Sequence, residues 1–425
     1  MSWLPPPPPF VASIFNDKLV VDDRLPDAVF SVGVIPGLID GAGRIKLGLL
    51  LPRPIFWVQL VVLLAFQTTL CIGLALVILN FVVKRRGSPS AYLVGYGLVI
   101  PAVLAFPYAV ISWLDIQNTM SRFVLYVPTL ITFRVLEAMH CHEEDVPTAE
   151  ASVSNYVLFY SCLVEVKYDA ETTKPLSLTQ MEIVKRLWRI VSQYLMLSIL
   201  YSLVIENFFA PFDVPMEAHT LDHNLPDIFH LGHLGNNLIG AYLMFLTLSF
   251  SQSAVAFAIN VFGFKTVDVM RNPLLESTSP SDFWSRRWNQ VIHSMLKRGV
   301  FKPMARSFPR AVAIGATFFV SGLLHEYVWS FIFFQHDDVE RFTPGYGKSM
   351  VFFAYNGLIM CIENLIAHWP VFQIVKSTLP KPVITHLVLL TALPCGHLFT
   401  GDLIKGGYFA DFAVALPLIV KLKEM

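Results

Sequence analysis

A long run without any charged side chain, residues 55–83, limits what this chain can fold into more than any other feature. The run begins after Arg53 and ends at the basic triplet Lys84-Arg85-Arg86. A helix needs about 20 apolar residues to cross the hydrocarbon core of a bilayer. Within that core the backbone polar groups must be paired internally, as they are in a helix. The run therefore predicts a membrane-spanning helix.

Further apolar segments predict an all-α, polytopic membrane helix bundle with roughly eight to ten transmembrane segments. The segment at residues 123–139 is the weakest, because Arg134 and Glu137 interrupt it, and we expect it to be short or tilted and to face the protein interior. The polar residues 270–307 predict a re-entrant or interfacial motif loop. The remaining predicted spans are residues 91–113, 187–206, 234–264, 311–334, 350–375, 383–399 and 408–420.

The composition excludes a soluble globular protein. Of the 425 residues, 55% are hydrophobic and only 15% are charged, whereas soluble domains average about 25% charged residues. The formal net charge is +0, so no global field attracts nucleic acid, and we expect membrane lipid as the surrounding partner. Five cysteines, an odd number without CxxC spacing, indicate neither a disulfide framework nor a zinc cluster.

The chain is expected to have two parts. Residues 1–50 form an N-terminal proline-rich or interfacial arm, in which the run Pro5–Pro9 favours polyproline II and no basic segment precedes an apolar core. Residues 51–425 form one helical membrane domain. Basic clusters after residue 83, before residue 187 and across residues 286–310 favour the cytosolic side, and the acidic segment 206–234 favours the opposite side.

A polar block followed by a buried ionisable pair is the best candidate for chemistry. The block is Ser279-Pro-Ser-Asp-Phe-Trp-Ser-Arg-Arg-Trp-Asn289, and His325-Glu326 lies within the apolar segment that follows it. Ionisable side chains are costly in a membrane span and usually mark a functional site. A neutral buried imidazole at His325 can accept the proton of an alcohol that attacks a thioester. Asn289 can donate a hydrogen bond to the developing oxyanion or hold the acyl carbonyl.

Simpler interpretations remain open for each element alone. His325 can be a core histidine that bonds a neighbour, and Arg286 with Arg287 can anchor the chain at the interface beneath two tryptophans. Glu326 points about 100° away from His325 on a helix, so we expect it to pair with a neighbouring helix rather than to orient the imidazole. Only the combination favours an active site.

Together, the motifs resemble the membrane-bound O-acyltransferase superfamily, in its wax synthase-like branch of plant wax synthases and fungal terpenoid O-acetyltransferases. The resemblance covers residues 271–326, the motif core, through Arg271-Asn-Pro, the polar block and Phe319-Val-Ser-Gly-Leu-Leu-His-Glu326. It implies that His325 is the catalytic base and Asn289 the second catalytic residue. Some relatives carry histidine at that second position, where this chain has Asn289. In this chain His293, one turn further on, could take the place of that histidine. The Arg-Gly-Ile-Gly-Trp segment of fungal relatives is not evident.

The resemblance also implies the substrates. It predicts an acyl-coenzyme A co-substrate, either acetyl-CoA or fatty acyl-CoA, with no bound cofactor, and a hydroxylated lipophilic acceptor. Lys297 and Arg298 are further cationic partners for the donor's phosphates. The expected substrate-binding residues are Trp284, Arg286, Arg287, Trp288, Ser321 and Glu326.

Two histidine-rich stretches contain metal-ligand residue types. In residues 140–145 two histidines lie two positions apart, without a second cluster at a recognised spacing. The second stretch consists of His219, His223, His230 and His233. Of these, His230 and His233 are three residues apart and would lie on one face of a helix. A solvated loop is the simpler interpretation of both, so we expect no metal.

These observations predict an acyl-CoA-dependent O-acyltransferase of the endoplasmic reticulum membrane. The favoured reaction is acetylation of a terpenoid-type secondary metabolite, because the chain carries a distinctive N-terminal arm. The alternative within the class is a long-chain-alcohol O-fatty-acyltransferase, that is, a wax synthase. An alternative of another class is a transporter of a small lipophilic or anionic solute, since intramembrane polar residues also mark transport paths. A third possibility is a catalytically inactive relative that acts as a membrane scaffold.

Overall fold

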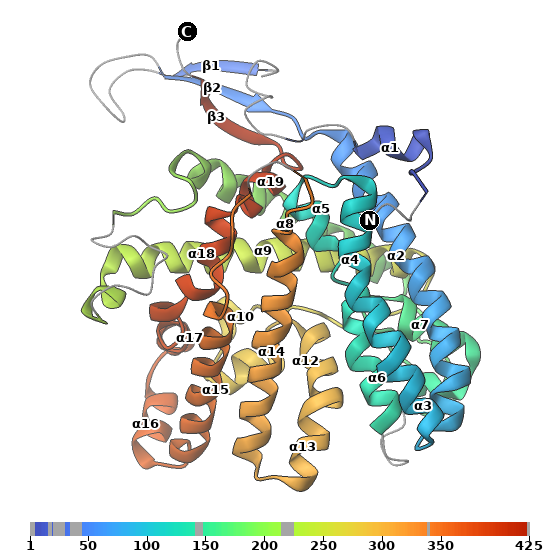
Figure 1. The fold of residues 1–425 in the computed structure, drawn as a ribbon. Coiled ribbons are helices and arrows are strands. Elements are labelled where there is room, and N and C mark those ends of the chain that lie inside the picture. The colour runs from blue at the N-terminus through green and yellow to red at the C-terminus, as the bar shows by residue number, and fades with distance from the viewer. Residues whose placement is uncertain are drawn as a thin grey trace.

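The computed structural model describes residues 5–15, 19, 30–34, 45–140, 148–213, 225–337 and 341–422. Within them, helices dominate and stand mostly side by side along one direction (Figure 1). The long helices and their neighbours are α1 (Pro9–Phe15), α2 (Pro54–Phe81), α3 (Pro89–Val94), α4 (Ile100–Leu114), α5 (Thr119–Val124), α6 (Ile131–His140), α7 (Val153–Ser161), α8 (Gln180–Val204), α9 (Leu231–Val261), α14 (Arg310–Ile332), α15 (Lys348–Ile366), α16 (Pro370–Thr378), α17 (Lys381–Leu390), α18 (His397–Lys405) and α19 (Tyr408–Ala413).

Seven segments in the described part of the chain are long and apolar enough to cross a membrane, or up to eight if a bent pair counts as one span. The bent pair, Lys381–Cys395 with His397–Lys405, turns by 62° and corresponds to the predicted span at residues 383–399. The prediction of an α-helical membrane bundle is confirmed, and the described residues reach the lower limit of the predicted eight to ten spans only when the bent pair is counted. The weak segment at Thr119–His140 has the largest buried share of all, 61%, as expected for an element that faces the protein interior.

The last predicted span, residues 408–420, is wrong. The helix α19 ends at Ala413, and residues 418–422 form the strand β3 (Leu418–Leu422). Val414 and Leu416, between the two, are completely buried. An apolar run that is enclosed by protein has the same hydropathy as one that faces lipid, so the pattern alone did not separate these cases.

A small antiparallel sheet, which the sequence did not indicate, joins the two ends of the chain. Its order is β1 (Phe30–Val34), β2 (Ile45–Leu50) and β3, with Phe30 opposite Leu49 and Leu50 opposite Leu418. It lies at one end of the molecule, and α3 and α13 (Lys302–Ser307) lie at the other (Figure 1). The basic clusters near residues 84–86 and 302–310 therefore lie at the same end of the molecule.

The motif segment is not an open loop but a chain of short helices. These are α10 (Pro273–Glu276), α11 (Pro280–Asp282), α12 (Gln290–Leu296) and α13, with π-helical turns at Phe283–Arg287 and Lys297–Phe301. π-Helical turns are rare and are often found at functional sites. The short helices keep the backbone of this polar segment hydrogen-bonded, which matters beside membrane spans.

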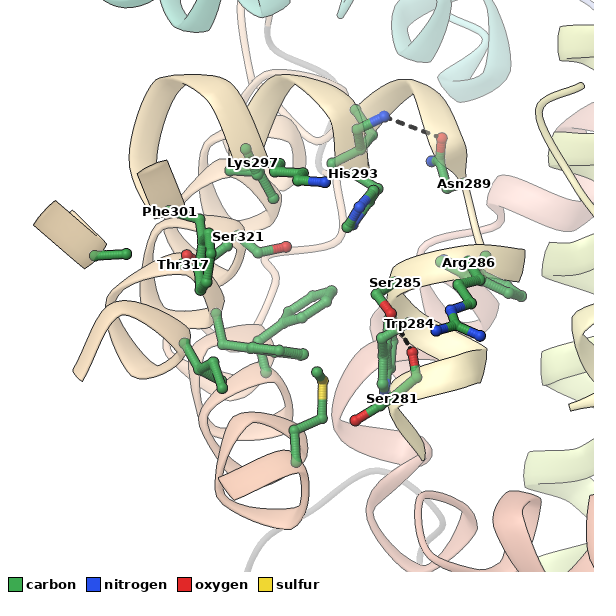
Figure 2. A pocket seen from close by; sticks show the side chains of 18 of the residues that line it. Ser281, Trp284, Ser285, Arg286, Asn289, His293, Lys297, Phe301, Thr317 and Ser321 are labelled. Atoms are coloured by element: carbon green, nitrogen blue, oxygen red, sulfur yellow. Dashed lines mark hydrogen bonds between the residues drawn. The ribbon is translucent and has the colours of Figure 1, made fainter. Parts of the chain in front are cut away.

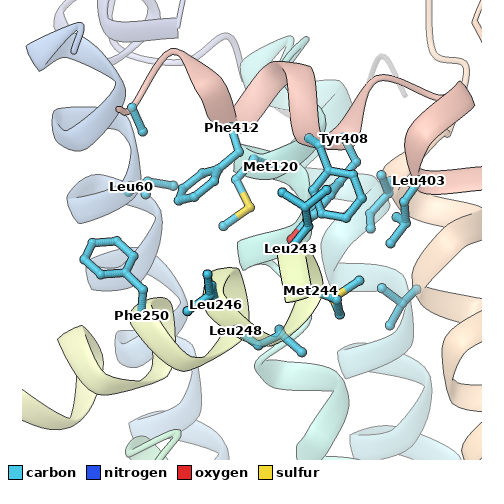
Figure 3. Close-up of a cluster of buried hydrophobic side chains, with 14 of the residues drawn as sticks. Leu60, Met120, Leu243, Met244, Leu246, Leu248, Phe250, Leu403, Tyr408 and Phe412 are labelled. Atoms are coloured by element: carbon cyan, nitrogen blue, oxygen red, sulfur yellow. The ribbon is translucent and has the colours of Figure 1, made fainter. Parts of the chain in front are cut away.

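The largest apolar core is built around α9. Leu243, Leu246 and Phe250 of α9 pack with Leu60 of α2 and Phe412 of α19 (Figure 3). A separate apolar cluster forms where α14 and α15 meet the motif segment. It comprises Ile314, Phe318, Phe352, Phe353 and Leu398, with Trp284 packed against it.

Small residues allow α14 and α15 to approach closely. A Cβ atom at Gly322 would lie 2.8 Å from the Met350 Cα, and one at Gly357 would lie 3.0 Å from the Phe318 Cβ. Glycine at such crossings permits close backbone contact, which is a common way for helices to associate in membranes. This close pair forms one side of the candidate site.

Candidate active site

A cavity of about 650 Å³ lies between the motif segment and the helix pair α14 and α15. Figure 2 shows Asn289, His293 and Lys297 on one side of it and Ser281, Trp284 and Ser285 on another. The cavity is lined by Ser281, Trp284, Ser285, Arg286, Trp288, Asn289, Ile292, His293, Leu296, Lys297, Phe301, Ala305, Arg310, Ile314, Thr317, Phe318, Ser321, His325, Phe353 and Met360. Six of the eight predicted site residues are therefore brought together.

One face of α14 runs along the cavity. The residues of α14 that line the cavity recur at helical spacing, starting at the N-terminus of the helix: Arg310, Ile314, Thr317, Phe318, Ser321 and His325. At a rise of about 1.5 Å per residue, the stripe from Arg310 to His325 is about 22 Å long. The cavity thus connects a basic end of the bundle with a histidine set deep in a span.

Local hydrogen bonding sets the protonation of the His325 ring. Its Nδ1 lies 2.6 Å from the backbone oxygen of Ser321. A carbonyl oxygen only accepts, so Nδ1 carries the proton, and the neutral imidazole has its lone pair at Nε2. The ring stacks on Phe353, with centroids 4.4 Å apart, and meets Phe399 edge-on at 5.1 Å. His325 is therefore held as a proton acceptor between aromatic rings.

Asn289 begins the helix α12. Its backbone has φ 33°, a left-handed conformation that asparagine tolerates better than most residues. Its Oδ1 accepts from the Ile292 N–H at 3.4 Å and from Gln252 Nε2 at 3.2 Å. With Oδ1 used in this way, the Nδ2 group is the end of the amide that remains to donate to a ligand in the cavity.

The aromatic residues of the polar block form a wall. Trp284 lies edge-on to Phe318, with centroids 5.8 Å apart, and edge-on to Trp288 at 6.2 Å. Its indole Nε1 donates to Asn356 Oδ1 at 3.2 Å. Ser321 lies on α14 one turn before His325, and its side chain is buried. These residues give the middle of the cavity an apolar lining with a few polar groups.

Three exposed cations line the cavity: Arg286, Lys297 and Arg310. No carboxylate in the described part of the chain forms an ion pair with them. Exposed cations without a carboxylate partner favour anionic ligands such as phosphate groups. His293, which lies between Lys297 and Asn289 along α12, is neutral: burial and the neighbouring Lys297 and Arg298 lower its pKa to about 4.

Two predicted substrate-binding residues lie outside the cavity lining. Arg287 forms ion pairs at 2.7 Å with Asp282 and with Glu276, so it braces the turn of the motif segment. Partial burial would raise the pKa of Asp282, but the Arg287 guanidinium outweighs it and holds that pKa below its usual range. The prediction that Arg287 binds the donor overlooked these two acidic residues, which precede it in the same segment.

Glu326 is the second predicted substrate-binding residue that lies outside the cavity lining. Its Oε1 accepts from the backbone N–H groups of Ser349, at 2.9 Å, and Met350, at 3.3 Å. These groups belong to the first turn of α15, whose N–H groups have no partner within the helix. Glu326 therefore pairs through Oε1 with a neighbouring helix, as its 100° offset from His325 suggested, and it does not line the cavity. Arg298 is also placed elsewhere, since it is paired with Glu137 and Glu165.

The α15 side of the cavity was not predicted. Phe353 and Met360 line the cavity, and Asn356 and Glu363 bond the motif segment, although none of these was singled out from the sequence. Their spacing of three and four residues places them on one helical face. Polar residues at that spacing within an apolar span were the signal that could have identified this wall.

The histidine-rich stretches do not combine into a metal site among the described residues. His230 Nδ1 accepts from the Gly232 N–H, and the buried His233 bonds Asn237 and Pro394. Residues 141–147, His219 and His223 lie outside the described residues. Asp115, His336 and Asp337 lie close together. There, His336 bonds Asp115 and Arg341 pairs with Asp337, which accounts for the cluster without an ion.

The fold and the cavity define a polytopic helical membrane protein with a neutral histidine and an amide enclosed among its helices. Residues 267–355 match the model of the membrane bound O-acyl transferase family. The matched region contains both Asn289 and His325, and it is a part of the chain rather than its whole length. The resemblance to the wax synthase-like branch is confirmed by its relatives.

Three curated relatives from Arabidopsis thaliana show this similarity. The chain is 30% identical over 146 residues to probable long-chain-alcohol O-fatty-acyltransferase 9, covering 31% of this chain and 38% of the relative. It is 29% identical over 180 residues to probable long-chain-alcohol O-fatty-acyltransferase 6, covering 38% and 49%. It is 27% identical over 130 residues to acyl-CoA–sterol O-acyltransferase 1, covering 29% and 35%. The matches therefore span less than half the length of these relatives.

Proposed function

We propose that this protein transfers an acyl group from coenzyme A to the hydroxyl of a lipophilic alcohol, with fatty acyl-CoA and a long-chain alcohol as the substrates. The observation that carries the proposal is the Nδ1 bond of His325 to the Ser321 carbonyl, which leaves Nε2 as a base inside the cavity. A histidine with a purely structural role in the core would be enclosed by packed side chains, whereas His325 lines a cavity of about 650 Å³. The family match supports the same reaction class.

In the proposed reaction, His325 Nε2 removes the proton from the acceptor hydroxyl as its oxygen attacks the thioester carbonyl carbon. The carbonyl π electrons move to oxygen, and the Nδ2 group of Asn289 donates to the resulting oxyanion. When the carbonyl re-forms, the carbon–sulfur bond breaks and coenzyme A leaves as a thiolate. The thiolate takes the proton from the imidazolium, which restores His325. Both substrates are bound together, so no covalent intermediate on the protein is needed.

The charge distribution suggests how the donor is bound. We place its phosphates at the exposed cations Arg286, Lys297 and Arg310, and its thioester beside His325. The stripe of about 22 Å along α14 is long enough for the extended arm that separates these two parts of coenzyme A. Trp284 and Trp288 then form the wall along this arm, and Ser321 lies next to the reacting centre.

The expected preference for acetyl transfer to a terpenoid gives way to the fatty acyl alternative. Two of the three relatives are named as fatty-acyltransferases of long-chain alcohols. Of the bulky residues that could shorten the donor site, Phe318 lines the cavity, but Phe319 is 50% exposed on the outer surface. Trp329 is buried behind His325 and does not line the cavity. A sterol acceptor belongs in the tests because one relative is named for it.

The test is acyl transfer in microsomes from cells that express the wild type, His325→Ala or Asn289→Ala at matched levels. Palmitoyl-CoA and acetyl-CoA are offered with a long-chain alcohol, a sterol and a terpenoid alcohol. We expect wax ester from palmitoyl-CoA with the wild type. We expect no product above background with His325→Ala, and a loss of about 100-fold with Asn289→Ala, the cost of one oxyanion donor.

Two controls make the result decisive. His386→Ala changes an exposed histidine on α17 whose Nδ1 bonds a backbone oxygen as that of His325 does, and it should leave the activity unchanged. Co-fractionation with markers tests the endoplasmic reticulum as the site, which we propose because a soluble donor and a lipid acceptor meet there. Ester formation that survives His325→Ala would refute its role as the base. If no pair gives ester, the transporter alternative takes precedence.

A further inference from the structure

One face of α15 contacts the site at four successive positions. Phe353, Asn356, Met360 and Glu363 follow each other at intervals of three, four and three residues, so they lie in one row along the helix. Phe353 stacks on the His325 ring at 4.4 Å. Met360 lines the cavity between the two polar positions. The row therefore extends from the proposed base toward the basic end.

The two polar residues of this row both bind the motif segment. Asn356 Oδ1 accepts from the Trp284 indole at 3.2 Å, and Glu363 Oε2 accepts from the N–H and the hydroxyl of Ser281, each at 2.7 Å. Trp284 and Ser281 are three residues apart in the segment that carries Asn289. The helix that packs against His325 thus also holds the other half of the site.

Asn356 is the more deeply set of the two. It is 2% exposed, and its Nδ2 donates to the Phe352 backbone oxygen at 2.8 Å, which fixes the direction of the amide. A buried amide in an apolar span is costly unless its groups are paired. Helix α15 has its own backbone bonds, so the Asn356 side chain is not needed to form the helix. Its outward bond serves Trp284.

Trp284 is in turn central to the cavity wall. Besides Phe318, it contacts Phe353, with centroids 5.8 Å apart, and Phe352 at 6.3 Å. A buried indole N–H usually finds a hydrogen-bond partner, and this directional bond defines the orientation of the ring more narrowly than the aromatic contacts do. The only such bond of this indole within the described residues is the one to Asn356.

We propose that Asn356 is a positioning residue for acyl transfer: it fixes the Trp284 indole, and thereby the width of the cavity on the way from the basic end to His325. This inference rests on the proposed function. Asn356 touches no reacting atom. Its effect is on how the donor's arm and acyl chain are seated, so it should appear first in the KM for the donor and in the preference between donors.

The test compares Asn356→Leu with Asn356→Asp, which keeps an oxygen at the Oδ1 position. Both are combined with Trp284→Phe, which removes the indole N–H. Tyr355→Phe is the matched control, because it removes a bond of the neighbouring α15 residue, 2.9 Å to the Thr391 backbone oxygen, on another face. Donor KM, kcat and the ratio of palmitoyl to acetyl transfer are measured for each, with Tm in detergent.

We expect Asn356→Leu to raise the donor KM about tenfold, which corresponds to about 1.4 kcal/mol, and to change the donor ratio. Asn356→Asp should recover most of this loss, and Tyr355→Phe should show none. In the Trp284→Phe background, Asn356→Leu should have little further effect on KM or on Tm. Equal, additive losses in both backgrounds would overturn the proposal, as would a loss confined to Tm. A wild type without acyl transfer would instead refute the proposed function, and additive Tm effects would then refute the positioning contact.

Discussion

Replacing Arg298 by methionine should destabilise the motif segment more than any change at its exposed arginines. Arg298 follows α12, and its guanidinium lies between two carboxylates from other parts of the chain. Its Nε is 2.9 Å from Glu137 Oε1 on α6, and its terminal nitrogens bond Glu165. Glu165 also accepts from the Ser294 hydroxyl at 3.0 Å. Burial alone would raise the pKa of Glu165, but Arg298 holds it below its usual range.

The size of the effect follows from burial. Glu137 and Glu165 have only 6% and 17% of their side-chain surface exposed, and Arg298 has 23%. Removing one partner of a buried ion pair costs about 3–5 kcal/mol, because the other charge stays buried without compensation. The partial exposure of Arg298 places the expected loss near about 3 kcal/mol. For a chain of this length that corresponds to a fall in Tm of about 3 °C, on the entropy per residue of globular proteins.

The assay is thermal unfolding in detergent of the wild type, Arg298→Met and the double variant Arg298→Met with Glu137→Gln. The double variant removes one negative charge together with the positive one, so it should regain part of the lost Tm, while Glu165 stays without its partner. Arg271→Met, at an exposed position of the same segment, should change Tm little. A fall of less than about 1 °C for Arg298→Met, or no recovery in the double variant, would refute the reasoning.

Two further predictions concern His293 and Glu326. The pKa of His293 in the folded protein, about 4, is below the ordinary histidine value of 6.5 because of burial and the neighbouring cations. The unfolded chain thus binds the proton more readily, and up to about 3 kcal/mol of stability should be lost as the pH falls from 6.5 to 4; an unchanged pH profile of Tm in His293→Gln would contradict this. Glu326→Ala should lower the free energy of unfolding by about 2 kcal/mol through the lost cap of α15, and Glu326→Gln by less. A raised donor KM at unchanged Tm would instead show that Glu326 contacts substrate.

Sequence reasoning located the part of the site that is continuous in the chain. His325 stands out because it interrupts an apolar span, and Asn289 because it closes an aromatic and basic block. Both features are local, so they can be read without knowing how the helices pack. The same holds for the spans, which hydropathy identifies directly.

The rest depends on contacts between distant segments. Arg287 and Arg298 look alike from the sequence, as basic residues near tryptophans, but both are paired with acids, and two of those, Glu137 and Glu165, lie more than 130 positions earlier. Asn356 and Glu363 look like isolated polar residues of a span. Their partners are known only once α15 is placed beside the motif segment. The short sheet was missed for the same reason, since its strands come from opposite ends of the chain.

The helix α14 shows why proximity to His325 in the sequence is a poor guide to function. Successive residues are rotated by about 100°, so neighbours face different surroundings. His325 and Ser321 face the cavity, whereas Gly322 and Glu326 face α15. Leu323, only two residues from His325, is 44% exposed on the outer surface. The adjacent residues His325 and Glu326 therefore serve different ends: one faces the proposed substrates, and the other holds the helix whose Phe353 stacks on the imidazole ring.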